Sequence, residues 1–464
     1  MSAPVALAGN PVVQENAHPG ARDWWGRHAP PHAIEGYSTQ CSVRPGERLE
    51  LCVSTRPAAR YKIVIYRLGW YGGRGARTLA VHPSAGDLQG APRAVSEPRP
   101  GPQIDAARWP VTDSIAIESD WTDGVYLARL LLTSGEHAGE DALVPFVVRA
   151  PLHRHAPILV QQPVTTAQAY NHWGGKSLYA SNSTDGTAAV KVSFDRPYAA
   201  RSVANFNAHW PFGCDYQLLR YLEREGLDAS YTTDIDTHRE PWSLVGHQLL
   251  MTSGHDEYWT REMRDAFEEA LAGGANLACM GANTGYWQMR FEDDERTMVE
   301  YRWRAHDPEP DRALKTELFR DLEPPRPECL LWGVQYQDGL GRPAEQRDYA
   351  LTEECAGHPW LEGTGFEHPC ELRGLVGYEW DALQAGLTPA DATVFFHYDS
   401  ELSAADALVR RDRSGAAVFA AGSLQFSWGL DDWGCPGHAD ERLQRFMRNA
   451  LRELAPRAGA RADR

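Results

Sequence analysis

Apolar residues in the first third of the chain recur in short runs that fit β-strands. Arg48–Ser54 (RLELCVS) and Tyr61–Leu68 (YKIVIYRL) alternate with a period of two residues, and Val125–Leu132 and Leu143–Val148 add two further apolar runs. Turn-forming residues separate the runs, and no helical period lies between them. We therefore expect residues 1–150 to form an N-terminal β-sandwich of immunoglobulin-like or jelly-roll type.

Two segments within or next to these residues contain aromatic or histidine side chains but match no binding or catalytic motif. Gly69–Gly73 (GWYGG) lacks the GxGxxG spacing, and no helical pattern follows it. We expect a turn with two exposed aromatic side chains rather than a phosphate site. Ala150–Pro157 (APLHRHAP) is interpreted as a solvated linker, because its two histidines, His153 and His155, have no third ligand candidate nearby.

Beyond the linker, strand-like and helical patterns alternate. The expected strands are Ile158–Gln162, Ser230–Thr233, His247–Thr252, Asn276–Met280, Thr393–His397 and Ala417–Ala421. The expected helices are Tyr216–Glu225, a segment that starts at Thr260 and ends at Gly273, and Glu441–Leu454. This alternation indicates that residues 151–464 form one α/β domain with a largely parallel sheet. The fold class expected for the whole chain is α+β multidomain.

The composition narrows the function classes. The 464 residues carry a formal net charge of −17, which disfavours general binding to nucleic acid or to anionic membranes. No apolar stretch approaches the ~18 residues that span a bilayer. The first twenty residues lack the pattern of a secretory signal, and the eight cysteines form no CxxC pair. We expect a cytoplasmic protein with reduced thiols.

Polar and aromatic clusters follow three of the expected strands. Ile158–Gln162 is followed by Thr165–Tyr179, His247–Thr252 by Ser253–Trp259, and Asn276–Met280 by Gly281–Trp287. In an open α/β sheet, ligands bind at the carboxyl ends of the strands. These three clusters, rich in His, Glu, Asn and Tyr, therefore predict a functional site at that edge.

The residue types limit the chemistry of this site. The sequence contains no GxSxG, Walker A or HExxH motif, and Cys279 lies within a strand, which is typical of a buried core cysteine. A carboxylate with tyrosines is an all-oxygen donor set that suits Fe(III). From chemistry alone, zinc at His255 and Glu257 and a metal-free acid–base site remain alternatives.

The same clusters carry a resemblance to a known family. Ala169–Asn171, Ser177–Tyr179, Ser253–Trp259 and Gly281–Asn283 together resemble the large (beta) subunit of N,N-dimethylformamidase and its C-terminal-domain family. The similarity extends over roughly Pro157 to Leu454, and Tyr37–Arg149 resembles the sandwich that accompanies this domain. The resemblance implies a catalytic domain similar to glutamine-amidotransferase-type α/β folds, with a mononuclear ferric ion held by two tyrosines and one glutamate.

Carried over to this chain, the resemblance implies Tyr170, Tyr179 and Glu257 as the metal ligands. The segment between the two tyrosines is shorter than expected for the amidase, so Tyr198 and Tyr216 remain alternatives to Tyr179.

The resemblance also implies three catalytic residues. His255 and Asn283 would orient the ligands or the substrate, and Glu379, in the segment Gly377–Trp380 (GYEW), would act as a general base.

The sequence therefore predicts an iron-dependent amidohydrolase that cleaves a small, N-alkyl amide C–N bond with metal-activated water. Two alternatives are a non-catalytic protein that binds a carbohydrate-like ligand and a zinc hydrolase that uses His255 and Glu257. The expected partners are a small amide substrate and, as one option, further copies of the same chain. Nothing in this sequence supplies the small partner subunit that the amidase uses.

Overall fold

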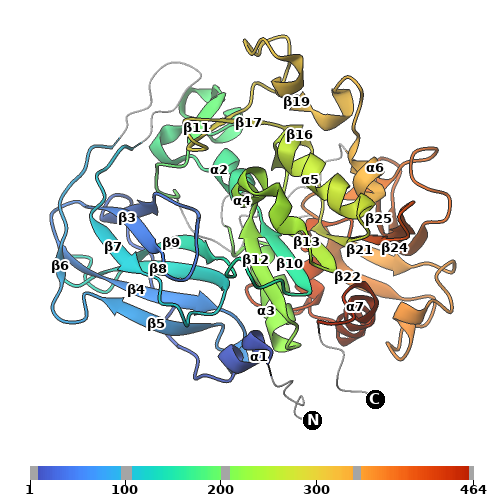
Figure 1. Cartoon of the computed structure of the whole chain (residues 1–464), viewed down its shortest axis with the longest axis horizontal. Coiled ribbons are helices and arrows are strands. Elements are labelled where there is room, and N and C mark those ends of the chain that lie inside the picture. The colour runs from blue at the N-terminus through green and yellow to red at the C-terminus, as the bar shows by residue number, and fades with distance from the viewer. Residues whose placement is uncertain (1–8, 96–106, 200–209, 338–345, 459–464) are drawn as a thin grey trace.

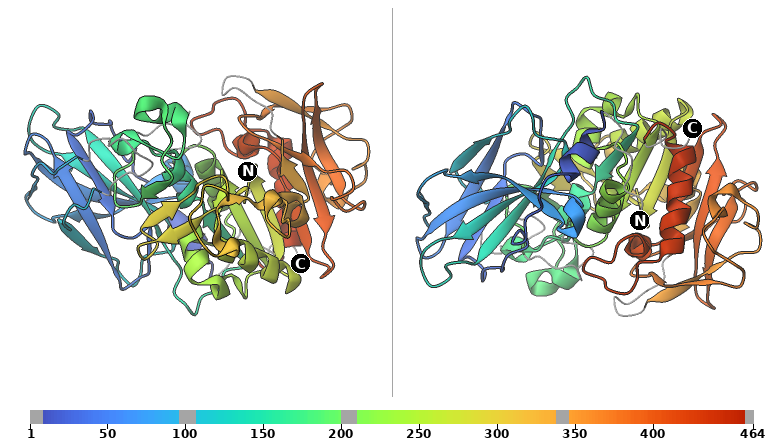
Figure 2. Two further views of the ribbon diagram at one scale, coloured as in Figure 1. Left: turned by 90° about the horizontal axis from the view of Figure 1, so that it is seen from above. Right: turned by 90° about the horizontal axis from the view of Figure 1, so that it is seen from below.

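A computed structural model describes residues 9–95, 107–199, 210–337 and 346–458 of the chain. The protein is α+β, with several β-sheets and few helices (Figure 1). The N-terminal sheets lie at one end and the last strands at the other, with parallel strands between them (Figure 2). No helix within the described ranges is both long and apolar enough to cross a membrane.

Residues 34–148 form two β-sheets that share a core. Their strand orders are β1-β3-β7 and β2-β9-β8-β4-β5, and β6 also pairs with β4. The strands are β1 (Ile34–Ser38), β2 (Ser42–Val43), β3 (Arg48–Thr55), β4 (Arg60–Leu68), β5 (Ala76–His82), β6 (Leu88–Gln89), β7 (Asp113–Ala116), β8 (Gly124–Leu132) and β9 (Asp141–Val148). The four strands expected from the sequence are confirmed as β3, β4, β8 and β9.

Strand β4 is buried on both of its faces. Because side chains alternate across a strand, Ile63 and Ile65 point into the core between the two N-terminal sheets. Val64, Tyr66 and Leu68 point the other way, into a second core that continues into the C-terminal region. The N-terminal sheets and the rest of the chain therefore pack directly on each other.

The C-terminal region is built on a nine-stranded mixed sheet, so the expectation of a largely parallel sheet is wrong for half of it. The strand order is β12-β10-β13-β15-β26-β25-β24-β21-β22, in which the first five strands are parallel and the others antiparallel. The strands are β10 (Ile158–Gln162), β12 (Ala229–Thr233), β13 (Leu249–Gly254), β15 (Asn276–Gly281), β21 (Arg347–Leu351), β22 (Glu371–Val376), β24 (Thr393–Asp399), β25 (Ala404–Arg411) and β26 (Ala417–Ala420).

The helices are short, and three of them match the sequence expectation closely. They are α1 (Pro11–Asn16), α2 (Val164–Tyr170), α3 (Asp215–Arg224), α4 (Asp234–Arg239), α5 (Arg261–Ala272), α6 (Glu328–Trp332) and α7 (Glu441–Leu454). Helix α5 begins where the sequence indicates, because the Thr260 side chain caps it by accepting a hydrogen bond from the Met263 amide. It buries Met263, Phe267 and Leu271 on one face.

Smaller strands complete the fold above the main sheet. One small sheet joins β11 (Lys191–Ser193), β18 (Thr297–Val299) and β17 (Arg290–Glu292), and another joins β14 (Tyr258–Trp259), β16 (Trp287–Gln288) and β19 (Glu317–Leu318). A third pairs β20 (Val334–Tyr336) with β23 (Asp381–Leu383).

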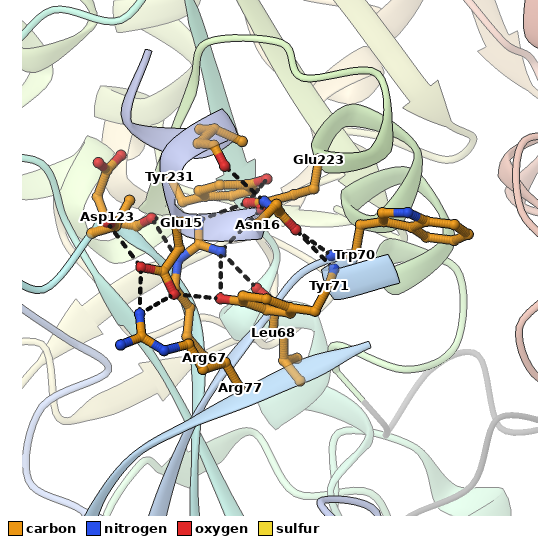
Figure 3. Close-up of polar contacts among 12 residues, drawn as sticks. Glu15, Asn16, Arg67, Leu68, Trp70, Tyr71, Arg77, Asp123, Glu223 and Tyr231 are labelled. Carbon is orange, nitrogen blue, oxygen red and sulfur yellow. Dashed lines mark hydrogen bonds and ion pairs between the residues drawn. The ribbon is translucent and has the colours of Figure 1, made fainter. Parts of the chain in front are cut away.

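A buried polar cluster joins β4 to α3, and it corrects the expectation that the aromatics of Gly69–Gly73 are exposed (Figure 3). Tyr71 is only 3% exposed, and its buried hydroxyl donates to Glu15 and accepts from Arg67. Trp70 is half-buried. Arg67 donates to both carboxylate oxygens of Glu223 on α3, at 2.7 and 3.0 Å.

The segment between β9 and β10 contains the predicted boundary at residues 150/151. Leu152, His153 and His155 are exposed, as expected for a linker. Arg154 pairs with Asp123 on one side and with Asp228 on the other, so the segment is held to both regions. Whether the two regions fold separately stays a prediction, which the Discussion takes up.

Candidate metal centre and active site

The six site residues proposed from the sequence lie in one cluster. Strands β10, β13 and β15 are parallel neighbours, so their carboxyl ends meet at one edge of the sheet. Helix α2 and the loop after it, which follow β10, contribute Tyr170 and Tyr179. The segment after β13 contributes His255 and Glu257, the segment after β15 contributes Asn283, and Glu379 enters from the loop between β22 and β23.

Glu257 stands at the centre of this cluster and is 3% exposed. Tyr170 Oη donates to Glu257 Oε2 at 2.9 Å, and Tyr179 Oη lies 3.0 Å from both carboxylate oxygens. The two phenol rings stack with their centroids 4.1 Å apart. Trp287 Nε1 donates to Glu257 Oε1 at 3.0 Å. Two phenol oxygens and two carboxylate oxygens therefore converge on one point.

The two alternative tyrosines lie elsewhere. Tyr216 Oη donates to the Gly75 carbonyl at 2.6 Å, within the junction with the N-terminal sheets. Tyr198 lines a cavity together with His28 and Ala142 of the N-terminal region. Of the four tyrosines considered from the sequence, Tyr170 and Tyr179 are those that contact Glu257.

A second group of polar side chains adjoins Glu257. His255 Nε2 lies 3.0 Å from Glu379 Oε2 and 3.4 Å from Glu257 Oε2. Asn283 Nδ2 donates to Glu379 Oε2 at 2.9 Å. The amide must present its nitrogen to this carboxylate, so its Oδ1 points elsewhere, and within the described residues Oδ1 is buried without a hydrogen-bond partner. It is a buried acceptor whose hydrogen-bonding capacity these residues leave unused.

Asn283 and Glu379 differ in how the fold holds them. The Asn283 backbone is in the left-handed conformation, with φ of 54°, and its backbone N–H donates to Asp381 Oδ1 at 2.9 Å. Asn is one of the few residues that tolerate this conformation. The Glu379 side chain is 14% exposed, so it lies between the buried cluster and solvent rather than on the open surface.

Burial sets the electrostatics of the site. It raises the pKa of Tyr170 and of Tyr179 well above the usual value, and the Glu257 carboxylate raises both further. Burial also raises the pKa of Glu257, although His255 opposes this shift. Burial would lower the pKa of His255, but the Glu379 and Glu257 carboxylates outweigh it and raise this pKa to about 9. The isolated cluster therefore favours neutral phenols.

The donor set fits a ferric ion. One carboxylate and two phenolates supply three negative charges through hard oxygen donors, which match the charge and the preference of a trivalent cation. Such a cation would reverse the effect of burial and lower the pKa of both phenols. Zinc more commonly takes imidazole and thiolate ligands, whereas phenolate and carboxylate oxygens are the harder donors that a trivalent cation prefers. The donor types therefore favour a ferric ion at the tyrosine-containing set.

Sequence reasoning missed three residues that contact the cluster: Tyr258, Trp287 and Arg302. Tyr258 Oη donates to Tyr179 Oη at 2.6 Å, and Arg302 donates to Tyr258 Oη at 2.9 Å. Tyr258 and Trp287 lie within the segments Ser253–Trp259 and Gly281–Trp287, which follow two of the parallel strands. Their place at these strand ends could have identified them as site residues. Arg302 comes from a loop without periodic pattern, and nothing in its surroundings singles it out.

Cys279 is a buried core cysteine, as expected. It is 0% exposed within β15, and burial raises the pKa of its thiol to about 12. A thiol that stays protonated is a poor nucleophile.

Arg196 fixes the segment that carries the two tyrosines. It is 0% exposed, and its guanidinium donates to Gln168 Oε1 and to the carbonyls of Gln168, Trp173, Lys176 and Ser193. These bonds tie the end of α2 to the loop before Tyr179. The hydrogen bonds of one buried guanidinium thus hold a segment that contains little regular secondary structure.

Replacing Arg196 by methionine is expected to loosen this segment. Several buried carbonyls would lose their donor, and we expect the free energy of unfolding to fall by about 1–3 kcal/mol. Metal content should fall with it, because Tyr170 and Tyr179 would no longer be held together. Urea unfolding and metal analysis measure the two effects, with the exposed Arg373→Met as the matched control. Unchanged values of both in Arg196→Met would contradict this role.

The fold and the site define an α+β protein with a buried cluster of carboxylate, tyrosine and histidine side chains at the carboxyl edge of a parallel sheet segment. The chain belongs to the family described as N,N-dimethylformamidase beta subunit-like, C-terminal, whose model matches residues 62–441. The match starts in β4 and ends at the first residue of α7, so it crosses the segment between β9 and β10.

Two curated relatives, each about a quarter identical over a part of the chain, support this assignment. The N,N-dimethylformamidase beta subunit of Paracoccus aminophilus is 26% identical over 152 residues, which cover 32% of this chain and 20% of the relative. The beta subunit of the same name from Alcaligenes sp. is 25% identical over 152 residues, with the same coverage. The matched stretch thus spans about a fifth of the length of these relatives.

Proposed function

We propose that the chain is an iron-dependent amidohydrolase that cleaves the C–N bond of a small N-alkyl amide. The observation that carries the proposal is the convergence of Tyr170, Tyr179 and both oxygens of Glu257 beside the pair of His255 and Glu379. The names of the relatives, which are amidase subunits, support the reaction class.

In the proposed reaction, water adds to the amide carbonyl and the C–N bond breaks, which yields a carboxylic acid and an amine. Ferric iron held by Tyr170, Tyr179 and Glu257 would supply Lewis acidity to this site. Glu379 is the candidate base, because its side chain is 14% exposed and its Oε2 is fixed by Asn283 Nδ2 and His255 Nε2. It would accept the proton of the attacking water.

His255 and Asn283 have complementary roles in this proposal. The His255 ring lies between the carboxylates of Glu257 and Glu379, where its Nε2 proton can be given to the leaving nitrogen. Asn283 orients Glu379 through Nδ2 and presents Oδ1 to the substrate or to the attacking water. The chain thus supplies one group that takes a proton and one that gives it.

The test of the proposed function is metal analysis combined with an amide hydrolysis assay. The purified protein should hold close to one iron per chain, show a broad visible phenolate-to-iron band and release amine from small N-alkyl amides. Asn283→Ala should keep the band and lower turnover by about 10- to 1,000-fold, because it removes a positioning group and not a ligand. If the purified protein is iron-free and colourless and still hydrolyses small N-alkyl amides, the metal mechanism is refuted.

The finer structural and cellular assignments are also proposals. We infer an immunoglobulin-like or jelly-roll sandwich for the N-terminal sheets and a glutamine-amidotransferase-like fold for the C-terminal region, supported by the two facing sheets and by the parallel order β12-β10-β13-β15-β26. A cytoplasmic location agrees with the cysteines, which are all unpaired. A partner chain is proposed from the subunit names of the relatives.

A further inference from the structure

A directed chain of hydrogen bonds runs from Arg302 to Glu257. Arg302 donates to Tyr258 Oη at 2.9 Å, Tyr258 Oη donates to Tyr179 Oη at 2.6 Å, and Tyr179 Oη contacts Glu257 at 3.0 Å. The direction is fixed at its start, because a guanidinium has donors and no acceptor. The Tyr258 oxygen must accept from Arg302, which leaves the Tyr258 proton to point at Tyr179.

Arg302 is held in place from several sides. Its guanidinium carbon lies 4.5 Å from the centre of the Tyr179 ring and 4.7 Å from that of the Trp287 ring. It also donates to the Leu178 carbonyl at 2.9 Å, next to Tyr179. Both rings that it contacts belong to residues that bind Glu257.

The backbone of Arg302 is strained. Its φ is 65°, in the left-handed region that favours glycine. A nonglycine residue persists in this conformation only where its surroundings hold it there. The Arg302 amide donates to Glu300 Oε1 at 2.6 Å, which helps to hold this conformation. The strain persists where the side chain meets Tyr258 and Tyr179, which points to a role of the side chain at the cluster.

We propose that Arg302 and Tyr258 are positioning residues that hold Tyr179 at the metal and lower the energy of the negative charge on its oxygen. This inference rests on the proposed function, since it assumes iron at Tyr170, Tyr179 and Glu257. A hydrogen bond and a nearby fixed cation stabilise a phenolate. A stabilised phenolate gives up an electron less easily, so its charge-transfer band lies at shorter wavelength. Removing either group should therefore move the band to longer wavelength.

The experiment compares Tyr258→Phe and Arg302→Met with the wild-type protein, each loaded with ferric iron. Both variants should shift the visible band to longer wavelength, and both should bind iron about 10- to 100-fold more weakly, as expected for partners that orient a ligand. Arg302→Lys, which keeps the charge, should shift the band less than Arg302→Met does. The iron affinity is measured by competition with a chelator.

The controls separate this role from a structural one. Tyr301 faces Arg290, and Arg304 pairs with Glu317, so Tyr301→Phe and Arg304→Met change the same residue types beside Arg302. Both should leave the band in place. Thermal unfolding of the metal-free proteins reports folding independently of the metal, and Tyr258→Phe, which removes one oxygen, should change it little.

Unshifted bands in iron-loaded Tyr258→Phe and Arg302→Met would overturn this inference while the proposed function stands. A shift of equal size in Tyr301→Phe would overturn it as well, because the effect would then not be specific to the chain from Arg302 to Tyr179. A colourless, iron-free wild-type protein would overturn the proposed function and this inference with it.

Discussion

Replacing Glu257 by glutamine is expected to abolish iron binding. In the structure both carboxylate oxygens accept hydrogen bonds, from Tyr170, Tyr179 and Trp287. A glutamine would place an NH2 group against one of these donors, and a neutral amide is a poor ligand for a trivalent ion. Iron content and the visible band should fall to background. Losing a residue that only supports a metal ligand lowers activity by up to about 100-fold, so losing the ligand Glu257 itself should lower turnover by at least about that much.

The matched control for this prediction is Glu269→Gln, an exposed position on α5 that makes the same chemical change away from the site. It should retain iron, colour and activity. Metal analysis, the visible spectrum and an amide hydrolysis assay measure the three quantities. Full iron content in Glu257→Gln would show that the metal is held elsewhere.

Replacing Glu223 by glutamine is expected to destabilise the whole protein. Arg67 and Glu223 have side chains 0% and 1% exposed, and they join β4 of the N-terminal sheets to α3 of the C-terminal region. The glutamine keeps the shape but leaves the guanidinium of Arg67 buried beside a neutral partner. Breaking one side of such a pair costs about 3–5 kcal/mol, which urea unfolding measures as a lower free energy of unfolding.

The double variant Arg67→Met with Glu223→Leu separates the pair from its surroundings. Replacing both charges by apolar groups should cost less than Glu223→Gln alone, because no buried charge is left without its partner. Glu323→Gln is the exposed control, since the pair of Arg312 and Glu323 is 74% and 70% exposed and should contribute less than about 1 kcal/mol.

The same measurement tests whether residues 1–150 form an independent domain. Because the two regions share this buried pair and a continuous core, we expect one cooperative transition in both the wild-type protein and Glu223→Gln. Two transitions, of which the variant shifts only one, would show that the regions unfold separately.

The sequence predicted the elements whose signals are local. The cap at Thr260 and the period of Met263, Phe267 and Leu271 give helix α5 its start and its buried face. The runs at β4 and β10 are apolar because both strands are buried, and this is visible without a partner strand. The strand-end argument also placed His255, Glu257 and Asn283 together, since the ends of adjacent parallel strands must meet.

Other features depend on segments distant in sequence, and the tertiary structure alone decided them. Whether β24 and β25 run parallel or antiparallel to their neighbours depends on how the long connections between β15 and β26 pack, and strand residues of either kind look alike. Tyr71 is buried because α1 and α3 close over it, although the GWYGG sequence is typical of an exposed turn.

The second tyrosine and the residues behind it belong to this group too. Tyr179, rather than Tyr198 or Tyr216, reaches Glu257 because the bonds of Arg196 fold the loop after α2 back on itself. Arg302 joins the cluster from more than forty residues beyond Glu257, along a loop with no periodic pattern. The sequence by itself determined which elements form and which strand ends carry chemistry, because these follow from local periodicity and from the geometry of parallel strands. The partners of each polar side chain were decided by the tertiary structure, because irregular loops are shaped by buried hydrogen bonds between residues far apart in the chain.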